Sequence, residues 1–156
     1  MRLRRGCSGG WIALLAALAD RLTKVAAQRL SRGALIPGVI NLRPTVNRGI
    51  AFSMLSGQGA WLAIMTLALI AAVTGWLVAH PHAPKLLRAG LWLIVGGGLG
   101  NLYDRVVYGY VIDFIEPAFV RFAVFNVADA GICVGAALAI LSVALTERRG
   151  RKRHGA

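Results

Sequence analysis

Long apolar stretches separated by short polar or charged segments dominate this 156-residue chain. Residues 59–79 contain no charged side chain, and three further apolar stretches occupy about 11–30, 86–105 and 126–146. A helix needs roughly 20 predominantly apolar residues to cross a bilayer. The pattern therefore predicts an all-α membrane protein, a single domain over residues 1–156 with four transmembrane helices at these ranges.

The segments at 31–58 and 106–125 have a different pattern. They mix β-branched and aromatic residues with Gly and Pro, most clearly at 36–42, 106–112 and 119–122. Such runs are typical of short strands bounded by turns, and their aromatic residues also suit the headgroup level of a membrane. We expect two outer loops that contain short strands or interfacial segments.

The N-terminus has two possible interpretations. Its arginines followed by an apolar stretch, with small residues at Ala17 and Ala19, resemble a cleavable secretory signal peptide. The helical pattern, however, continues through Leu30. We therefore favour a retained first helix.

Composition and charge indicate a membrane rather than nucleic acid as the partner. Hydrophobic residues make up 57% of the chain, against about 45–50% in soluble domains. The net charge is +12, but the compact basic clusters at 2–5, 85–88 and 148–153 flank helix ends. Such clusters are typical of cytoplasmic segments and contact anionic lipid headgroups. They predict cytoplasmic N- and C-termini, contact with membrane lipids and no nucleic-acid partner.

This topology brings polar residues together. The first and third helices run outward and the fourth runs inward, so all three reach the outer leaflet. The polar residues expected at that depth are Asp20, Lys24, Asn101, Asp104, Arg105, Asn126 and Asp129. Ionisable groups in membrane segments usually face a protein interior or water. We therefore expect a polar site near the outer face.

Some of these residues need no chemical role. Asp20 and Lys24 are four residues apart on one helical face, so an ion pair and a direct role are both open. Asp104 stands beside Arg105, and we interpret it as structural. Glycines at 96, 100, 131 and 135 predict close helix packing.

Asp113 and Asp129 have settings unlike those of the other acidic residues. Asp113 lies between apolar neighbours, which predicts a raised pKa. Asn126 is a good N-cap for the last helix, which would place Asp129 in the first turn, where the helix dipole favours negative charge. Asp129 could be a capping carboxylate only. Together, two carboxylates in unlike settings suit aspartic-protease chemistry, in which one is protonated and the other accepts a proton from water.

Other chemistries have less support. The histidines, His80, His82 and His154, fall on the cytoplasmic side, which argues against a serine–histidine or zinc site. A small proton- or ion-coupled transporter subunit is the alternative function, with acidic residues as a relay. Its carboxylates should approach both faces of the membrane, whereas five of the six acidic residues here fall on one side.

Five blocks in order give a specific resemblance. They are Asp20-Arg21-Leu22-Thr23-Lys24, Asn47-Arg48-Gly49-Ile50-Ala51-Phe52-Ser53, Gly100-Asn101-Leu102-Tyr103-Asp104-Arg105, Val111-Ile112-Asp113-Phe114-Ile115 and Phe125-Asn126-Val127-Ala128-Asp129. With four apolar helices, this pattern resembles lipoprotein signal peptidase, also called signal peptidase II, an aspartyl endopeptidase of the bacterial inner membrane. The chain departs slightly from the family at Arg21 and at Glu116-Pro117.

The resemblance implies a function and a site. It implies that Asp113 and Asp129 form the catalytic dyad, and that a group of residues binds substrate or supports the site, namely Asp20, Lys24, Asn47, Gly49, Asn101, Arg105 and Asn126. It also implies a small extramembrane β-sheet cradle and a diacylglyceryl-modified prolipoprotein substrate, cut before the lipidated cysteine near the periplasmic face. We expect a monomer that uses no cofactor and no metal.

Overall fold

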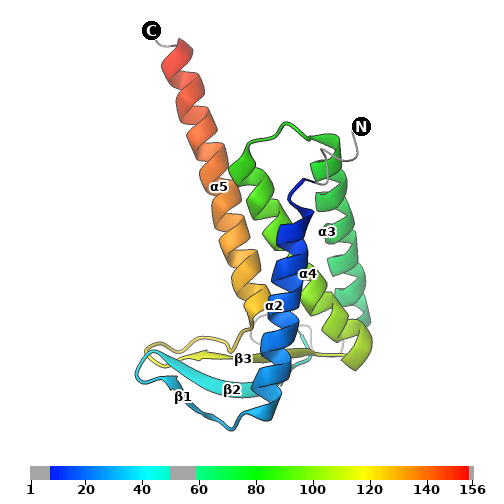
Figure 1. The fold of residues 1–156 in the computed structure, drawn as a ribbon, viewed down its shortest axis with the longest axis vertical. Coiled ribbons are helices and arrows are strands. Elements are labelled where there is room, and N and C mark those ends of the chain that lie inside the picture. Colours follow the sequence, from blue (N-terminus) through cyan, green and yellow to red (C-terminus); the bar gives the residue numbers. More distant parts are fainter. Residues whose placement is uncertain (1–7, 50–58, 155–156) are drawn as a thin grey trace.

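The computed structural model describes residues 8–49 and 59–154, with side chains described as far as Arg148. Four helices and three strands follow one another in this part of the chain (Figure 1). Their order is α2 (Gly10–Arg29), β1 (Gly33–Ile36), β2 (Ile40–Asn47), α3 (Gly59–Ala79), α4 (Lys85–Tyr108), β3 (Val111–Pro117) and α5 (Val127–His154). The fold is thus mostly helical with a small sheet, as expected.

The helices form a bundle, and the sheet closes one end of it. The start of α2 and the end of α5 lie at the opposite end from the sheet (Figure 1). The strands are antiparallel in the order β1-β2-β3, and Thr45 of β2 stands opposite Asp113 of β3. Ala27 of α2 packs with Leu42 and Phe114 of the sheet. This apolar contact fixes β3, and so Asp113, against the bundle.

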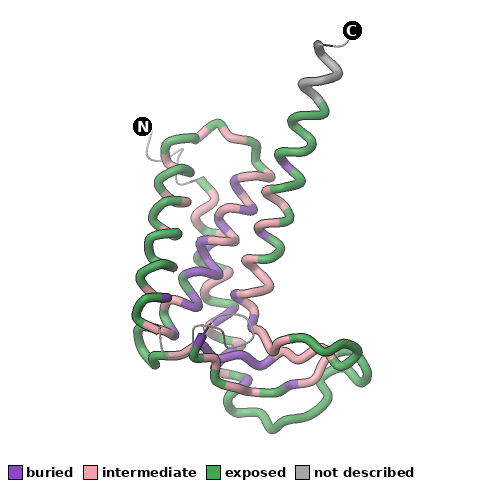
Figure 2. The backbone as a smooth tube through the Cα atoms, turned by 180° about the vertical axis from the view of Figure 1, so that it is seen from behind, coloured by how far each residue is buried: buried purple, intermediate pink, exposed green. Residues whose placement is uncertain are grey.

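Helix α4 lies at the centre and packs against α2, α3 and α5. Three consecutive glycines allow the close approach. A Cβ at Gly96 would lie 2.6 Å from the carbonyl oxygen of Ala13 in α2, and one at Gly98 would lie 3.1 Å from Ile70 in α3. A Cβ at Gly97 would collide with the carbonyl oxygen of Ala128 in α5. Buried positions accordingly follow α4 and gather where the helices meet the sheet (Figure 2).

The predicted glycine contacts are confirmed at three of the four positions. Gly96 contacts α2, Gly100 contacts the Asp20 side chain, and Gly135 lies against the backbone of Gly90. At Gly131, by contrast, a Cβ would lie 4.0 Å from its nearest neighbour, the carbonyl oxygen of Leu93. That position leaves room for a side chain, so the prediction of close packing there is wrong.

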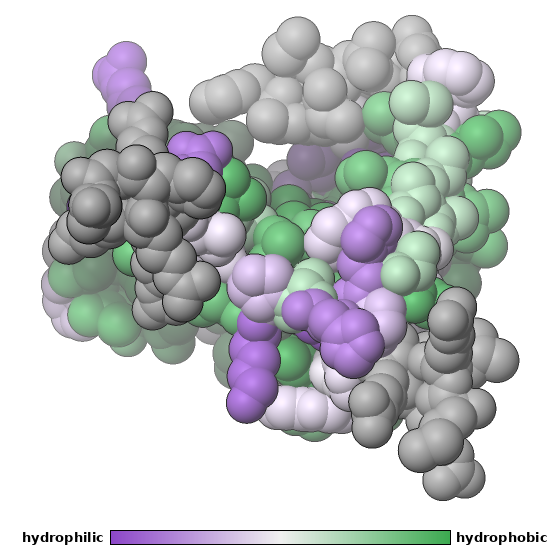
Figure 3. Space-filling view, turned by 90° about the horizontal axis from the view of Figure 1, so that it is seen from above, coloured by the Kyte–Doolittle hydropathy of each residue, from purple (hydrophilic) through white to green (hydrophobic). Residues whose placement is uncertain are grey.

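The outer surface of the bundle is strongly apolar. Leu14 is 60% exposed and Ile140 is 71% exposed, and such large apolar surfaces mark contact with lipid or protein. Seen from the end that carries the termini, hydrophobic surface flanks a gathering of hydrophilic residues (Figure 3). By length and composition, two of the described helices can cross a membrane, α3 over Gly59–Ala79 and α5 over Val127–Arg148. Helices α2 and α4 each contain four charged residues, among which Asp20, Lys24, Arg88 and Asp104 are buried.

Several predicted boundaries were wrong. Residues 106–108 form the last turn of α4, which ends where Gly109 adopts φ 77° and donates its N–H to the carbonyl of Arg105. Of the two possibilities left open for the segment 119–122, the strand is not formed, and Phe119, Val120 and Phe122 are exposed, as in an interfacial segment. The apolar stretch ends at residue 146, but α5 continues to His154, because the end of an apolar stretch is not the end of a helix. Within 36–42, Gly38 at φ 74° turns the chain between β1 and β2.

Candidate active site

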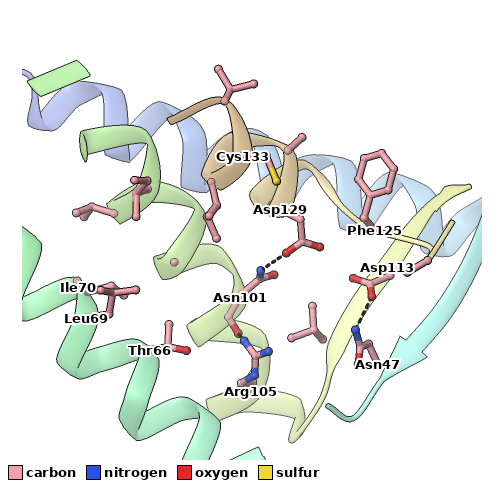
Figure 4. A pocket seen from close by; sticks show the side chains of 18 of the residues that line it. Asn47, Thr66, Leu69, Ile70, Asn101, Arg105, Asp113, Phe125, Asp129 and Cys133 are labelled. Atoms are coloured by element: carbon pink, nitrogen blue, oxygen red, sulfur yellow. Dashed lines mark hydrogen bonds between the residues drawn. The ribbon is translucent and has the colours of Figure 1, made fainter. Parts of the chain in front are cut away.

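Asp113 and Asp129 come from different elements and face one cavity of about 690 Å³. Asp113 is the third residue of β3, and Asp129 lies in the first turn of α5. Figure 4 shows both carboxylates directed toward the same space, with Asn101 and Arg105 of α4 beside them and α3 across the cavity. The two side chains singled out by the sequence therefore meet at the end of the bundle next to the sheet.

The Asp113 carboxylate is buried and hydrogen-bonded through both oxygens. The Nδ2 of Asn47 donates to its Oδ2 at 2.9 Å, and the Nδ2 of Asn126 donates to its Oδ1 at 2.7 Å. Burial raises the pKa of Asp113 to about 6, the hydrogen bond from Asn47 opposes the rise, and the negative charge of Asp129 adds to it. The prediction of a raised pKa is confirmed.

Asp129 is held at the start of α5 by a reciprocal cap. Its backbone N–H donates to the Oδ1 of Asn126 at 2.9 Å, and its Oδ2 accepts the backbone N–H of Asn126 at 3.2 Å. The Nδ2 of Asn101 donates to its Oδ1 at 2.7 Å. The N-cap prediction for Asn126 is confirmed, and Asp129 both caps the helix and faces the cavity.

Asn126 is the residue that links the two carboxylates. Its side-chain Nδ2 bonds to Asp113, while its backbone N–H bonds to Asp129. The same Nδ2 lies 3.1 Å from the Oδ1 of Asn101. Asn126 is fully buried, so these bonds replace water and fix the separation of the two acids.

A buried ion cluster stands behind the cavity. The Nζ of Lys24 lies 2.8 Å from Asp20, 2.8 Å from Asp104 and 3.0 Å from the Oδ1 of Asn101. The Oδ1 of Asp20 accepts the backbone N–H of Ala128 at 2.9 Å. The Asp20–Lys24 ion pair, one of the two possibilities left open by the sequence, is therefore present, and it joins α2 to α4 and to the start of α5. A buried charge is tolerated only with such partners.

Asp104 has a structural role, as the sequence indicated, but its partners are not the neighbour that the sequence suggested. Instead of pairing with its neighbour Arg105, Asp104 contacts Lys24 and, at 3.3 Å, the guanidinium of Arg21. Its Oδ2 also accepts the backbone N–H of Ile112 at 3.1 Å, next to Asp113. The available signal was its position three residues after Asn101, which puts both on one face of α4.

The remaining site residues lie on the sheet side of the cavity. The Oδ1 of Asn47 accepts the backbone N–H of Gly49 at 3.0 Å, and the Nη2 of Arg105 donates to the Gly49 carbonyl at 3.3 Å. Residues 50–53 of the second sequence block lie outside the described residues. Across the residues that the structure describes, no group of three His, Cys, Asp or Glu side chains is placed to hold a metal ion.

Comparisons with known proteins agree on one family. The family model for signal peptidase (SPase) II matches residues 12–145. A lipoprotein signal peptidase of Pseudoalteromonas translucida is 39% identical over 137 residues, covering 82% of each chain. One of Ralstonia nicotianae is 38% identical over 151 residues, covering 90% of this chain and 87% of the relative.

A solved structure, described as a bacterial membrane enzyme, has the same fold. It aligns with a TM-score of 0.83 and 27% sequence identity, covering 93% of this chain and 91% of that chain. Taken with the family match over most of the sequence, this likeness identifies the chain as a member of the signal peptidase II family of membrane-embedded lipoprotein signal peptidases.

Proposed function

We propose that this protein is an aspartic-type endopeptidase that removes signal peptides from diacylglyceryl-modified prolipoproteins, cutting before the lipidated cysteine. The observation that carries the proposal is that Asp113 and Asp129 face one cavity and are both hydrogen-bonded to Asn126. Two adjacent carboxylates that share one proton are the chemical requirement of this class of protease.

The environments of the two acids suggest how they divide the reaction. Asp113, with its raised pKa, holds the shared proton and donates a hydrogen bond to the oxygen of the scissile carbonyl. Asp129 then accepts a proton from water, whose oxygen attacks the carbonyl carbon. When the C–N bond breaks, the proton taken from water passes to the leaving amine.

The other residues of the site bind the substrate or hold neighbouring side chains in position. Asn101 and Arg105 line the cavity beside the dyad and can donate to substrate carbonyl groups. Asp20, Lys24, Asn47, Gly49 and Asn126 hold these groups in place, as their hydrogen bonds indicate. Leu69, Ile70 and Val73 of α3 make the cavity wall apolar away from the carboxylates, which suits the lipid part of the substrate.

The same proposal includes a topology. All four helices cross the bacterial inner membrane within one domain over residues 1–156, with both termini in the cytoplasm and the sheet near the periplasmic face. The charges in α2 and α4 are compatible with crossing because Asp20, Lys24, Arg88 and Asp104 are buried in protein. The protein acts as a monomer in membrane lipid.

The test is a cleavage assay with purified protein in detergent. A diacylglyceryl-modified prolipoprotein should lose the mass of its signal peptide, whereas the unmodified precursor should stay intact. Asp113→Asn should abolish the reaction, and Glu147→Gln, at the exposed far end of α5, should leave it unchanged. Absence of product with wild-type protein, or near-normal turnover by Asp113→Asn, would contradict the proposal. Globomycin should inhibit the wild-type reaction.

A further inference from the structure

A second hollow, which we call the outer cleft, adjoins the active-site cavity. It has a volume of about 480 Å³ and lies between β2, β3 and the segment that follows β3. Phe122 and Ala123 line both the outer cleft and the active-site cavity. A chain that leaves the cavity past these two residues therefore enters the outer cleft.

The outer cleft is polar and has an excess of positive charge. Arg43 and Glu116 line it and form an ion pair at 2.7 Å. Arg121 also lines it, is exposed, and makes no ion pair with any acidic side chain in the described part of the chain. Two guanidinium groups against one carboxylate favour an occupant that carries negative charge.

The distance along β3 suits a substrate chain. Glu116 is three residues beyond Asp113 on the same strand, which is about 10 Å in an extended conformation. The apolar part of a signal peptide remains in lipid, so the polar chain on the other side of the cut bond must leave toward water. Its first three residues after the cysteine can span the distance from the dyad to the outer cleft.

Recognition of that chain at this point depends on side chains rather than on strand pairing. On one side β3 pairs with β2, with Ile115 opposite Leu42. On the other side Ile115 exchanges backbone hydrogen bonds with Phe125. Both backbone edges of β3 are therefore occupied next to Glu116, which leaves the charged side chains of the outer cleft to make the contacts.

We propose that the outer cleft binds the first residues of the mature lipoprotein after the lipidated cysteine, and that Arg121 makes the enzyme favour acidic side chains there. This inference rests on the proposed function, and it adds a specificity determinant distant from the dyad. Arg121 contributes to substrate binding and not to the chemical step.

The test uses diacylglyceryl-modified prolipoprotein peptides that differ only in the three residues after the cysteine, with Glu, Ser or Lys at all three. Cleavage is measured in neutral phosphatidylcholine vesicles. Because exposed ion pairs are weak, wild-type KM should be about two- to fivefold lower for the Glu peptide than for the Lys peptide. Arg121→Glu should reverse this order, with kcat for the Ser peptide unchanged.

Arg32→Glu is the matched control, since it makes the same charge change at an exposed residue just before β1. It should keep the wild-type order of the three peptides. An unchanged order in Arg121→Glu, or equal shifts in both variants, would overturn the inference. So would an effect of Arg121→Glu that is seen only in vesicles with anionic lipid and is equal for all peptides, because Arg121 would then bind headgroups. If wild-type protein cleaved none of the peptides, the proposed function itself would fail.

Discussion

Asn126 combines two tasks in one buried side chain. Its Oδ1 caps α5, while its Nδ2 bonds to Asp113 and Asn101. An N-cap contributes about 1 kcal/mol, and a buried polar group left without a partner costs about 1–3 kcal/mol. Stability and dyad geometry therefore depend on the same residue, and substitutions can separate the two.

Asn126→Ser and Asn126→Ala should separate the effect on stability from the effect on the dyad geometry. Serine keeps an acceptor for the cap but is too short to reach Asp113, whereas alanine loses both. Asn126→Ala should lower the free energy of unfolding by about 1 kcal/mol more than Asn126→Ser, measured by denaturant unfolding in detergent. Both variants should lose most of kcat. A fully active Asn126→Ser protein would contradict the role assigned to the Nδ2 group.

Asp113 should make stability depend on pH. Its pKa is raised from 3.8 to about 6, so between these values the unfolded chain has lost a proton that the folded chain retains. Rising pH across this window must therefore destabilise the folded protein, by about 3 kcal/mol when complete, at about 1.4 kcal/mol per pKa unit. The unfolding free energy of wild type minus that of Asp113→Asn should fall from pH 4 to 6 and then level. A difference that stays constant with pH would show that folding does not raise the pKa of Asp113.

Local context in the sequence is enough to predict some residue roles but not others. The apolar neighbours of Asp113 and the cap position of Asn126 are visible within a few residues. The partners of Asp104 are not, because Lys24 and Arg21 lie about 80 residues earlier in the chain. Their meeting depends on how α2 packs on α4, which no local pattern encodes.

At the level of elements, the glycines of α4 set the distance between helices. Gly97 lies against the backbone of Ala128 at the start of α5, one turn from the Asn101 that bonds to Asp129. A change in this spacing should therefore affect both the packing and the dyad. Gly75 of α3, with open space around it, provides a matched position without such a contact.

Gly97→Ala should lower the free energy of unfolding by about 1–3 kcal/mol, as overpacking does, and should also reduce kcat. Gly75→Ala should be neutral or stabilising by up to about 1 kcal/mol, because alanine is the better helix former. Thermal unfolding in detergent and the cleavage assay measure the two effects. If the two variants behaved alike, the close approach of α4 and α5 would not matter for the site.

The sequence predicts the existence of the helices better than their ends. The charge-free stretch at 59–79 coincides with α3, whereas α4 and α5 both run beyond their predicted limits. The length of an apolar stretch indicates how much of the chain can contact lipid. A helix, however, ends at the residue that caps its backbone, as at Gly109. Strand pairing is likewise a long-range property, so the sequence could not decide whether the segment 119–122 is a strand or an interfacial segment.

At the scale of the whole molecule, alternation of helix direction places the polar ends of α2, α4 and α5 together. This consequence follows from topology alone, and the cluster of Asp20, Lys24, Asn101 and Asp129 agrees with it. The outer cleft could not be predicted, because it depends on how the segment after β3 folds back over the sheet.

Cysteine labelling tests the orientation of the molecule. In a Cys7→Ser, Cys133→Ser background, Arg32→Cys marks the sheet end and His82→Cys marks the exposed turn between α3 and α4. A membrane-impermeant maleimide should label Arg32→Cys in right-side-out inner-membrane vesicles and His82→Cys only in inverted ones. The opposite result would place the active site on the cytoplasmic side.

The central claim, that Asp113 and Asp129 act on one peptide bond as a single unit, is tested most directly by a double-mutant cycle. Turnover of a diacylglyceryl-modified prolipoprotein is compared for wild type, Asp113→Asn, Asp129→Asn and the double variant. Groups that act as a unit are strongly non-additive. Each single change should reduce turnover at least about a thousandfold, and the double change should reduce it no further. Losses that multiply in the double variant, or near-normal turnover in either single variant, would contradict the account.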